Sequence, residues 1–398
     1  MVPMPRFLSP HVGRVVAVFA LTAILYGCAS RPEPALNINA SAPQPDVASV
    51  VEVFAVTTRR PSSDQALRFS GQRTLAPSFA EVAVSIPRSR KAGEIQWPGR
   101  GAADLSQSFG TLRFETLERD AFGKRLLTRA SKKNRHVLVF VHGYNTRFDE
   151  AVFRLAQIVH DSGAEVTPVL FSWASWASLG SYPYDRESAA LARDSLELLL
   201  TKLADNPSVG QVSVLAHSMG GWLTLETMRQ MVIRKGGFSK KLQDVMLAAP
   251  DVDVEVALSH AHILEQARSK PNLTLFVSSD DKALEASRRI WGSTDRLGAI
   301  DPAKEPYKSI LARSGVTVFD LTSVQSGDAL QHGKFAQSGS VVTLIGQRLS
   351  KQALESEGSN GGVLHTIGKS AGNAIETVIA APSRLGEKPL PSSLDVER

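Results

Sequence analysis

Three continuous apolar runs, each followed directly by a helical pattern, constrain the fold of this chain more than any other feature. The runs 136–143, 166–173 and 211–218 are rich in valine and leucine and lack the polar alternation of a half-exposed strand. The segments between them, 148–163 and 185–205, carry apolar residues at helical spacing. Buried strands that alternate with helices predict an α/β fold with a mainly parallel sheet and helices on both faces.

Further strand patterns occur on either side of these runs, at 50–58, 80–87, 243–251, 272–281 and 315–323. Ligands of open parallel sheets bind at the carboxyl ends of the strands. We therefore expect the chemistry of this chain just after its strands.

The composition suits a single large globular domain, because 43% of the 398 residues are hydrophobic and 21% are charged. We predict that this domain spans 50–350. A flexible tether rich in proline and small polar residues is expected at 28–49, and a partly disordered tail at 351–398. Within the tail, the apolar pattern at 362–381 is interpreted as one helix.

The start of the chain has the pattern of a secretory signal. Arg6 and Arg14 precede a 13-residue apolar run at 15–27, which is too short for a comfortable membrane span. The run ends in Leu-Tyr-Gly-Cys, which resembles a bacterial lipoprotein box, and Cys28 is the only cysteine. We predict a cleaved signal peptide at 1–27 and a lipid-anchored membrane protein of the bacterial cell envelope that faces the periplasm. The alternative is a chance cysteine in an uncleaved anchor.

The charge pattern argues against nucleic acid as a partner. The formal net charge is +6, but the basic residues are scattered and no basic stripe is interleaved with aromatic residues. The chain also lacks metal-ligand spacing and phosphate-binding loops, so no cofactor and no metal are predicted. The oligomeric state is left open.

The sequence Ala-His-Ser-Met-Gly-Gly at 216–221 lies between a predicted strand and a predicted helix. This context is typical of a nucleophile elbow, which presents a serine at a sharp turn. Gly220 provides one of the two small positions that let strand and helix approach, and Ala216 adds only a methyl group at the other. Ser218 is therefore the predicted nucleophile. The alternative is a serine that caps the helix.

A serine needs a base and an acid that orients the base, and in this fold they follow in the order serine, acid, histidine. His332 lies in the loop after the last strong strand pattern, so we predict that it is the base. Asp281, just past the strand at 272–281, is the first choice for the acid. Asp280 and, less directly, Asp251 are alternatives. Each of the three aspartates could instead cap the helix that follows it.

The oxyanion hole requires two backbone amides near the nucleophile. Met219 follows the serine directly and is predicted to supply one of them. The other is assigned to Tyr144, which follows Gly143 in the loop after the strand at 136–143.

A loop rich in aromatic residues follows the strand at 166–173. Its rings are candidates for an acyl or aromatic pocket at the strand ends, and packing of the loop itself is an equally open role. The residues are Trp173, Trp176, Tyr182 and Tyr184.

Several ordered motifs resemble those of the bacterial alpha/beta-hydrolase family of unknown function DUF900. They are VLVFVHGYNTRFDEAVFRLAQIVHD, PVLFSWAS, YPYDRESA, LAHSMGG, LAAPDVDV and SSDDKAL, within a resemblance that covers about 50–350. The chain has Trp-Ala-Ser where the family often has Trp-Pro-Ser, and His-Ser-Met-Gly-Gly where it often has His-Ser-Met-Gly-Asn. The resemblance implies an esterase- or lipase-like hydrolase.

These features predict a serine hydrolase that cleaves carboxylic esters through an acyl-enzyme. The expected partners are a small-molecule or lipid ester as substrate and the membrane through lipidated Cys28. Acyl transfer or amide cleavage by the same triad remains an alternative, as does a non-catalytic envelope protein that retains the hydrolase fold.

Overall fold

The computed structural model describes residues 31–38, 47–99, 103–291, 294–350, 363–370 and 373–380, with the side chains of 47–48 and of the last two ranges excepted. The chain divides into two compact units, Met1–Glu33 and Pro34–Arg398. All of the described helices and strands belong to the second unit. The predicted signal peptide, Cys28 and half of the predicted tether lie outside the described residues. Among the helices that are described, none is both long enough and apolar enough to span a bilayer.

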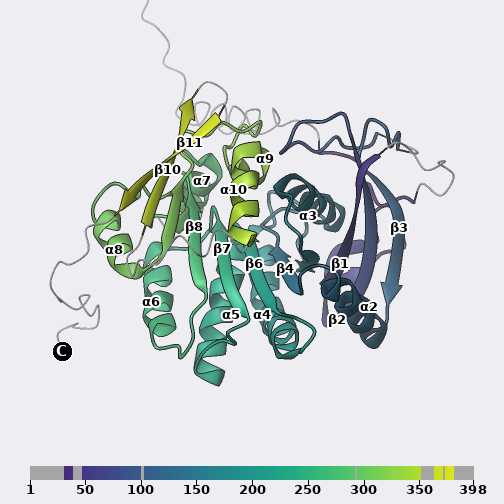
Figure 1. Ribbon diagram of the computed structural model, residues 1–398, viewed down its shortest axis with the longest axis horizontal. Helices are drawn as coiled ribbons and strands as arrows, with labels where there is room; N and C mark the ends of the chain where they lie inside the picture. The colour runs from purple at the N-terminus through teal and green to yellow at the C-terminus, as the bar shows by residue number, and fades with distance from the viewer. Residues whose placement is uncertain are drawn as a thin grey trace, which may run out of the picture. The chain divides into compact units, whose positions relative to one another are not determined.

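The described strands form one eleven-stranded sheet in the order β11-β10-β9-β8-β7-β6-β4-β5-β1-β2-β3 (Figure 1). The strands are β1 (Val47–Pro61), β2 (Phe69–Pro87), β3 (Gly110–Leu117), β4 (His136–Val141), β5 (Thr167–Ser172), β6 (Gln211–His217), β7 (Leu242–Ala248), β8 (Asn272–Val277), β9 (Thr317–Asp320), β10 (Val363–Ser370) and β11 (Asn373–Ala380). From β1 through β10 the neighbouring strands run parallel. Antiparallel β2 and β3 extend one edge and antiparallel β11 the other.

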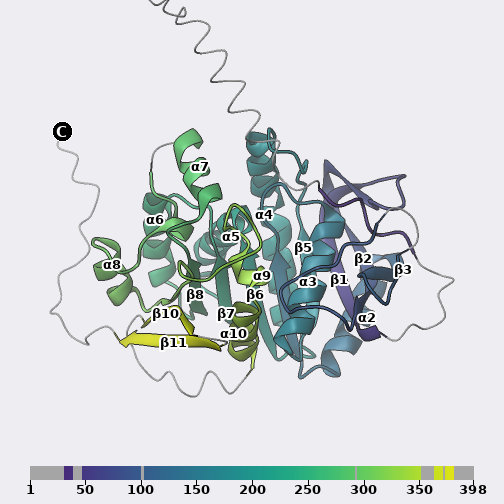
Figure 2. The same cartoon turned by 90° about the horizontal axis from the view of Figure 1, so that it is seen from above.

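Helices cover both faces of the sheet, which confirms the predicted fold class. They are α2 (Arg119–Ser131), α3 (Phe148–Ser162), α4 (Tyr182–Asp205), α5 (Met219–Lys235), α6 (Val254–Glu265), α7 (Lys282–Trp291), the 3₁₀ turn η1 (Leu297–Ala299), α8 (Tyr307–Ser314), α9 (Lys334–Gln337) and α10 (Gly339–Leu349). Helices α2, α4 and α5 pack on one face, and α3, α9 and α10 on the other. Figure 2 shows α5 and α10 on opposite sides of β6 and β7.

The two helix layers explain why the central strands are apolar throughout. In β4, Val137 and Val139 belong to the core beneath α4 and α5, whereas Leu138 and Phe140 belong to the core beneath α3 and α10. All four side chains are at most 2% exposed. A strand with both faces buried must be apolar at successive positions, as its sequence indicated.

The prediction of a helix at 362–381 is wrong, because the structure has β10 and β11 there. Strand β10 pairs in parallel with β9, and β11 pairs antiparallel with β10. β-Branched residues are frequent in this segment, including Ile367, Ile375 and Thr377, and they favour extended backbone. Strand β3 and helix α2, which precede β4, were not predicted either.

Helix α5 lies so close to β4 that its second residue must be glycine. A Cβ atom on Gly220 would lie 2.4 Å from the carbonyl oxygen of His142 and 2.5 Å from that of Val141. Both neighbours are backbone atoms and cannot move aside as a side chain would. This contact fixes the start of α5 against the end of the strand.

We expect Gly220→Ala to lower the free energy of unfolding by about 1–3 kcal/mol, because the added methyl group overpacks this contact. The matched control is Gly123→Ala in α2, where a Cβ atom would have nothing within 4 Å. That change should raise the free energy of unfolding by about 0.5–1 kcal/mol, as alanine does at an open helical position. Urea unfolding of both variants provides the measurement, and equal effects at the two positions would contradict the close contact.

Candidate active site

Ser218 occupies a one-residue turn between β6 and α5. Its backbone angles, φ 55° and ψ −121°, lie in a region that non-glycine residues rarely adopt. Three backbone hydrogen bonds hold this conformation: the Ser218 amide donates to Ala248 at 3.0 Å, and the Ser218 carbonyl accepts from Gly221 at 2.9 Å and Asp251 at 3.1 Å. Its side chain makes no capping hydrogen bond to α5, so the helix-cap alternative has no contact to support it. Such strained turns are typical of functional positions.

His332 and Asp281 form a direct pair. His332 Nδ1 lies 2.7 Å from Asp281 Oδ2, and the Asp281 side chain is fully buried. The other oxygen, Asp281 Oδ1, accepts the Leu284 amide at 3.0 Å and so caps α7. Because the ionised carboxylate can only accept, His332 Nδ1 must carry the proton in this bond, which leaves Nε2 as the acceptor nitrogen.

The loop that carries His332 is held by its own carboxylate and by a contact with α7. Asp328 Oδ2 accepts the backbone amides of His332 at 2.9 Å and Gly333 at 3.0 Å. The carbonyl of Leu330 accepts the amide of Lys282, the first residue of α7, at 3.0 Å. These bonds fix the histidine relative to the helix that follows its partner Asp281.

Asp280 has a different partner from Asp281. Its carboxylate lies 2.6 Å from the amino group of Lys334, whose side chain is 2% exposed. Lys334 also donates to the Ser278 hydroxyl and to the carbonyls of Leu321 and Thr322. A buried ammonium requires such compensation, so Asp280 neutralises Lys334 and ties together the ends of β8 and β9. Of the two adjacent aspartates, Asp281 is the one that contacts His332.

Asp251, the third acid candidate, has hydrogen-bond partners other than His332. It accepts the hydroxyls of Tyr182 and Ser287, each at 2.9 Å, and its Oδ1 lies 3.6 Å from Arg296 Nε. Asp251 still influences the histidine through its charge. Burial lowers the pKa of His332, but the charge of Asp281, the hydrogen bond to it, and the charges of Asp251 and Asp328 outweigh burial and raise that pKa above its usual value.

His217 connects Ser218 to His332. Its ring centroid is 4.6 Å from that of His332 and 4.5 Å from that of Phe335, and its Nε2 lies 3.3 Å from the His332 carbonyl oxygen. Burial, followed by the charge of His332, lowers the pKa of His217 well below its usual value, so the ring is neutral and donates its N–H to that carbonyl. Within the described ranges the Ser218 hydroxyl makes no hydrogen bond to His332, and such catalytic contacts often tighten only with substrate.

The two residues predicted to supply the oxyanion amides, Met219 and Tyr144, lie next to Ser218 or in a loop that contacts it. Met219 is the first residue of α5, so its N–H has no acceptor inside the helix. The loop that contains Tyr144 touches the serine: a Cβ atom on the preceding Gly143 would lie 2.9 Å from Ser218 Cβ. Glycine at 143 is therefore required for the loop to approach the elbow.

A buried arginine supports this loop. Arg59, at the end of β1, is 1% exposed and donates to the Ser172 hydroxyl at 2.9 Å and to the carbonyl oxygens of Ser175 and Thr146. One of its terminal nitrogens lies 3.3 Å from His142 Nε2. Burial and the charge of Arg59 lower the pKa of His142 to about 3, so this ring stays neutral and structural.

Asp185 also supports the loop that contains Tyr144, which we call the oxyanion loop after its predicted role. It has no exposed surface, and it accepts the Ser175 hydroxyl at 2.5 Å, the Trp176 amide at 2.8 Å and the Asn145 amide at 3.3 Å. Burial raises the pKa of its carboxyl group. Sequence reasoning identified neither Arg59 nor Asp185 as part of the site, because nothing in the sequence distinguishes a buried charged side chain from an exposed one.

The four predicted pocket aromatics lie in three different places. Trp173 is fully buried, with its ring stacked 4.8 Å from that of His142, which is packing rather than lining. Trp176 and Tyr184 contact each other away from the serine, and the Tyr184 hydroxyl donates to the carbonyl of Gly71 in β2.

Tyr182 is the predicted aromatic residue that lies beside the elbow. Its hydroxyl donates to Asp251, and its ring lies 5.2 Å from the Tyr144 ring and 4.8 Å from the Trp291 ring at the end of α7. Trp291, which was not predicted, is 45% exposed. The three rings form an apolar surface next to the oxyanion loop.

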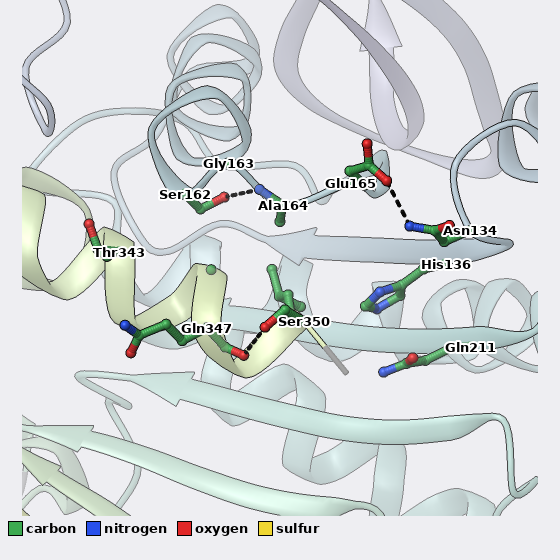
Figure 3. Close-up of a pocket in the computed structure, with 12 residues that line it drawn as sticks. Asn134, His136, Ser162, Gly163, Ala164, Glu165, Gln211, Thr343, Gln347 and Ser350 are labelled. Carbon is green, nitrogen blue, oxygen red and sulfur yellow. Dashed lines mark hydrogen bonds between the residues drawn. The ribbon is translucent and has the colours of Figure 1, made fainter. Parts of the chain in front are cut away.

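A cavity of about 510 Å³ lies at the amino-terminal ends of the central strands, between α10 and the start of β4 (Figure 3). Its lining includes His136 and Gln211, the first residues of β4 and β6. Ser218 follows the last residue of the seven-residue strand β6, so it is roughly 20 Å from this cavity at about 3.3 Å per residue. The cavity is therefore separate from the candidate site.

The described residues do not contain a candidate metal centre. No group of three or more His, Cys, Asp or Glu side chains among them is arranged to hold a metal ion. The predicted site combines a hydroxyl, an imidazole, a carboxylate and two backbone amides, which are the groups that covalent acyl chemistry uses.

Solved structures with some similarity to the chain include several esterases. One from the archaeon Pyrobaculum calidifontis has a TM-score of 0.34 and 15% identity, and the match covers 77% of this chain and 87% of that one. Carboxyl esterase 2 from the mycorrhizal fungus Tuber melanosporum has a TM-score of 0.38 and 12% identity over 87% of this chain and 99% of that one. No curated protein is significantly similar in sequence.

A family match is found directly in the sequence. The family described as "Alpha/beta hydrolase of unknown function (DUF900)" matches residues 118–348, from the start of α2 to the end of α10. Strands β1, β2 and β3 precede the matched region, which is shorter than the resemblance predicted from residue 50. The match covers more than half of the 398 residues, and the chain therefore belongs to the DUF900 family of alpha/beta hydrolases.

Proposed function

We propose that the protein is a serine hydrolase that cleaves carboxylic esters, with Ser218 as nucleophile, His332 as base and Asp281 as the acid that orients it. The observation that carries the proposal is the strained elbow at Ser218 near a histidine that is paired with a buried carboxylate. Membership of a hydrolase family supports it. The two backbone amides next to the serine add the remaining element of acyl chemistry.

In the proposed reaction, Ser218 Oγ attacks the ester carbonyl carbon while His332 Nε2 takes the hydroxyl proton. Asp281 holds the Nδ1 proton and stabilises the imidazolium. The amides of Tyr144 and Met219 stabilise the negative charge on the carbonyl oxygen. His332 then returns the proton to the leaving alkoxide, which departs as an alcohol. A water molecule deprotonated by His332 then attacks the acyl-enzyme and forms a second tetrahedral intermediate. The collapse of this intermediate releases the carboxylic acid, and His332 returns the proton to Ser218.

The enzyme is further proposed to act at the bacterial cell envelope, with lipidated Cys28 as its anchor. Support comes from the charged start, the 13-residue apolar run and the cysteine that ends it. Acyl chains on Cys28 would hold the domain close to membrane lipids and to other esters of the periplasm.

Replacement of Ser218 tests the nucleophile. We expect Ser218→Ala to lower kcat for p-nitrophenyl esters by at least about 10³-fold and to abolish labelling by a fluorophosphonate, because both require the hydroxyl. The control is Ser213→Ala, because Ser213 lies near the start of β6, at the end of the strand that is far from Ser218. This variant should still be labelled. Undiminished labelling of Ser218→Ala would contradict the assignment. A folded wild-type protein that neither reacts nor cleaves any of a broad ester panel would favour a non-catalytic role.

The pH dependence distinguishes the adjacent acids. His332 must be neutral to act as base, so kcat/KM should rise with pH through a pKa above the usual value of 6.5. Asp281→Asn removes the charge that raises this pKa, so its acidic limb should move to lower pH while kcat falls by about 10⁴-fold. Asp280→Asn should leave the limb in place, because Asp280 contacts Lys334. A shift caused by Asp280→Asn alone would reverse the assignment.

The anchor is tested by metabolic labelling with radioactive palmitate in a bacterial host. We expect the full-length chain to incorporate label and to sediment with membranes, and Cys28→Ala to do neither, because Cys28 is the only thiol available for acylation. Label that persists in Cys28→Ala would rule out lipidation at this residue.

A further inference from the structure

A buried arginine next to the elbow lacks the partners that a guanidinium needs. Arg296, just before η1, is 6% exposed, and its side chain makes no hydrogen bond to any residue in the described part of the chain. Its Nε lies 3.6 Å from Asp251 Oδ1, within ion-pair range but too far for a hydrogen bond, and this Nε is buried without an acceptor. An N–H group that is buried without an acceptor is costly, more so on a charged group.

Asp251 is held more closely by two hydroxyl groups than by this guanidinium. Its Oδ1 already accepts the Ser287 hydroxyl, and its Oδ2 accepts the Tyr182 hydroxyl. Both bonds are 2.9 Å long, shorter than the separation from Arg296. The carboxylate is therefore oriented by the two hydroxyls rather than by the arginine.

A second arginine adds positive charge to the same region. The guanidinium of Arg186 lies 3.6 Å above the ring of Trp222 in α5. Burial lowers the pKa of Arg186 and the charge of Arg296 acts in the same direction, whereas Tyr182 and Asp251 raise it. Arg186 and Arg296, which we call the arginine pair, are thus both influenced by the carboxylate of Asp251.

The arginine pair adjoins the predicted nucleophile. Trp222 lies one turn of α5 beyond Ser218, and the Asp251 amide donates to the Ser218 carbonyl at 3.1 Å. The backbone that follows Arg296 runs beside the same loop, with the Leu297 amide bonded to the Val252 carbonyl at 2.8 Å. The positive end of the α5 dipole also lies at this position and favours an anion.

We propose that the arginine pair is a subsite that binds an anionic group, a carboxylate or a phosphate, carried by the ester whose carbonyl reacts at Ser218. The role of the subsite in specificity rests on the proposed function. Carboxylate and phosphate oxygens match the donor fork of a guanidinium and supply the acceptors that Arg296 lacks. The stacked rings of Tyr182 and Trp291 provide an adjoining surface for the carbon chain between the two groups.

Direct binding tests the subsite without any turnover. Isothermal titration of the full-length Ser218→Ala protein uses glutarate and inorganic phosphate as probes, at constant ionic strength. We expect one or both to bind, and Arg296→Gln in the same background to weaken binding by about 10- to 100-fold, as expected for lost charge-assisted bonds. Arg288→Gln is the matched control, because Arg288 lies on α7 with a side chain that is 42% exposed and paired with Asp295.

The two probes distinguish the sources of the anion. Binding of glutarate alone assigns a carboxylate, and binding of phosphate alone assigns a phosphorylated substrate. Absence of binding by both overturns the subsite, as does binding that Arg296→Gln leaves intact. Thermal unfolding checks that the variants fold. If Arg296→Gln does not fold, Arg186→Gln takes its place with the same expected loss.

Kinetics with matched esters then test specificity. The pair is the 4-nitrophenyl monoester of glutaric acid and 4-nitrophenyl pentanoate, whose acyl chains are equally long and differ in the terminal carboxylate. The ratio of their kcat/KM values should fall about 10-fold or more in Arg296→Gln, mainly through KM of the anionic ester, and stay constant in Arg288→Gln. An unchanged ratio would refute the role in specificity. If neither ester is cleaved by the wild-type protein, the proposed function fails while the binding result still decides the subsite.

Discussion

Between β6 and α5 the chain changes from strand to helix within one residue, and the close contact that this turn requires determines the rest of the site. Gly220 permits α5 to touch the carbonyls of β4, and Gly143 permits the next loop to touch Ser218 itself. The serine is held in its strained conformation by hydrogen bonds to Ala248, at the end of β7, and from Asp251, just after that strand. The site is thus built from backbone that has little freedom to relax.

Three loops near Ser218 are each held by one buried charged side chain. Arg59 holds the oxyanion loop, Asp185 holds the turn after β5, and Lys334 joins the ends of β8 and β9. These side chains contact backbone carbonyls or amides, which secondary structure leaves unpaired where strands end. Burial is costly for a charge unless such partners are present, so each side chain specifies one arrangement of its loop. Arg296 differs, because its buried Nε has no acceptor among the described residues.

The buried central strands and the position of Ser218 after a strand follow from features that a sequence displays directly. Valine-rich runs indicated the central strands, and the spacing of small residues around Ser218 indicated the turn. The sequence did not decide between Asp280 and Asp281, because that choice depends on the direction in which each side chain points from the end of β8. Arg59 and Asp185 were missed because burial is a property of the folded chain. The edge strands β10 and β11 were taken for a helix, since a short apolar segment has no periodicity that separates the two.

Asp281 uses its two oxygens for different parts of the molecule: one begins α7 and the other holds His332. The far end of the same helix presents Trp291 to Tyr182, beside the oxyanion loop. Helix α7 therefore contacts the predicted site at both of its ends. A change in its position would disturb the histidine–carboxylate pair and the aromatic surface together, so neither can be altered through this helix without the other.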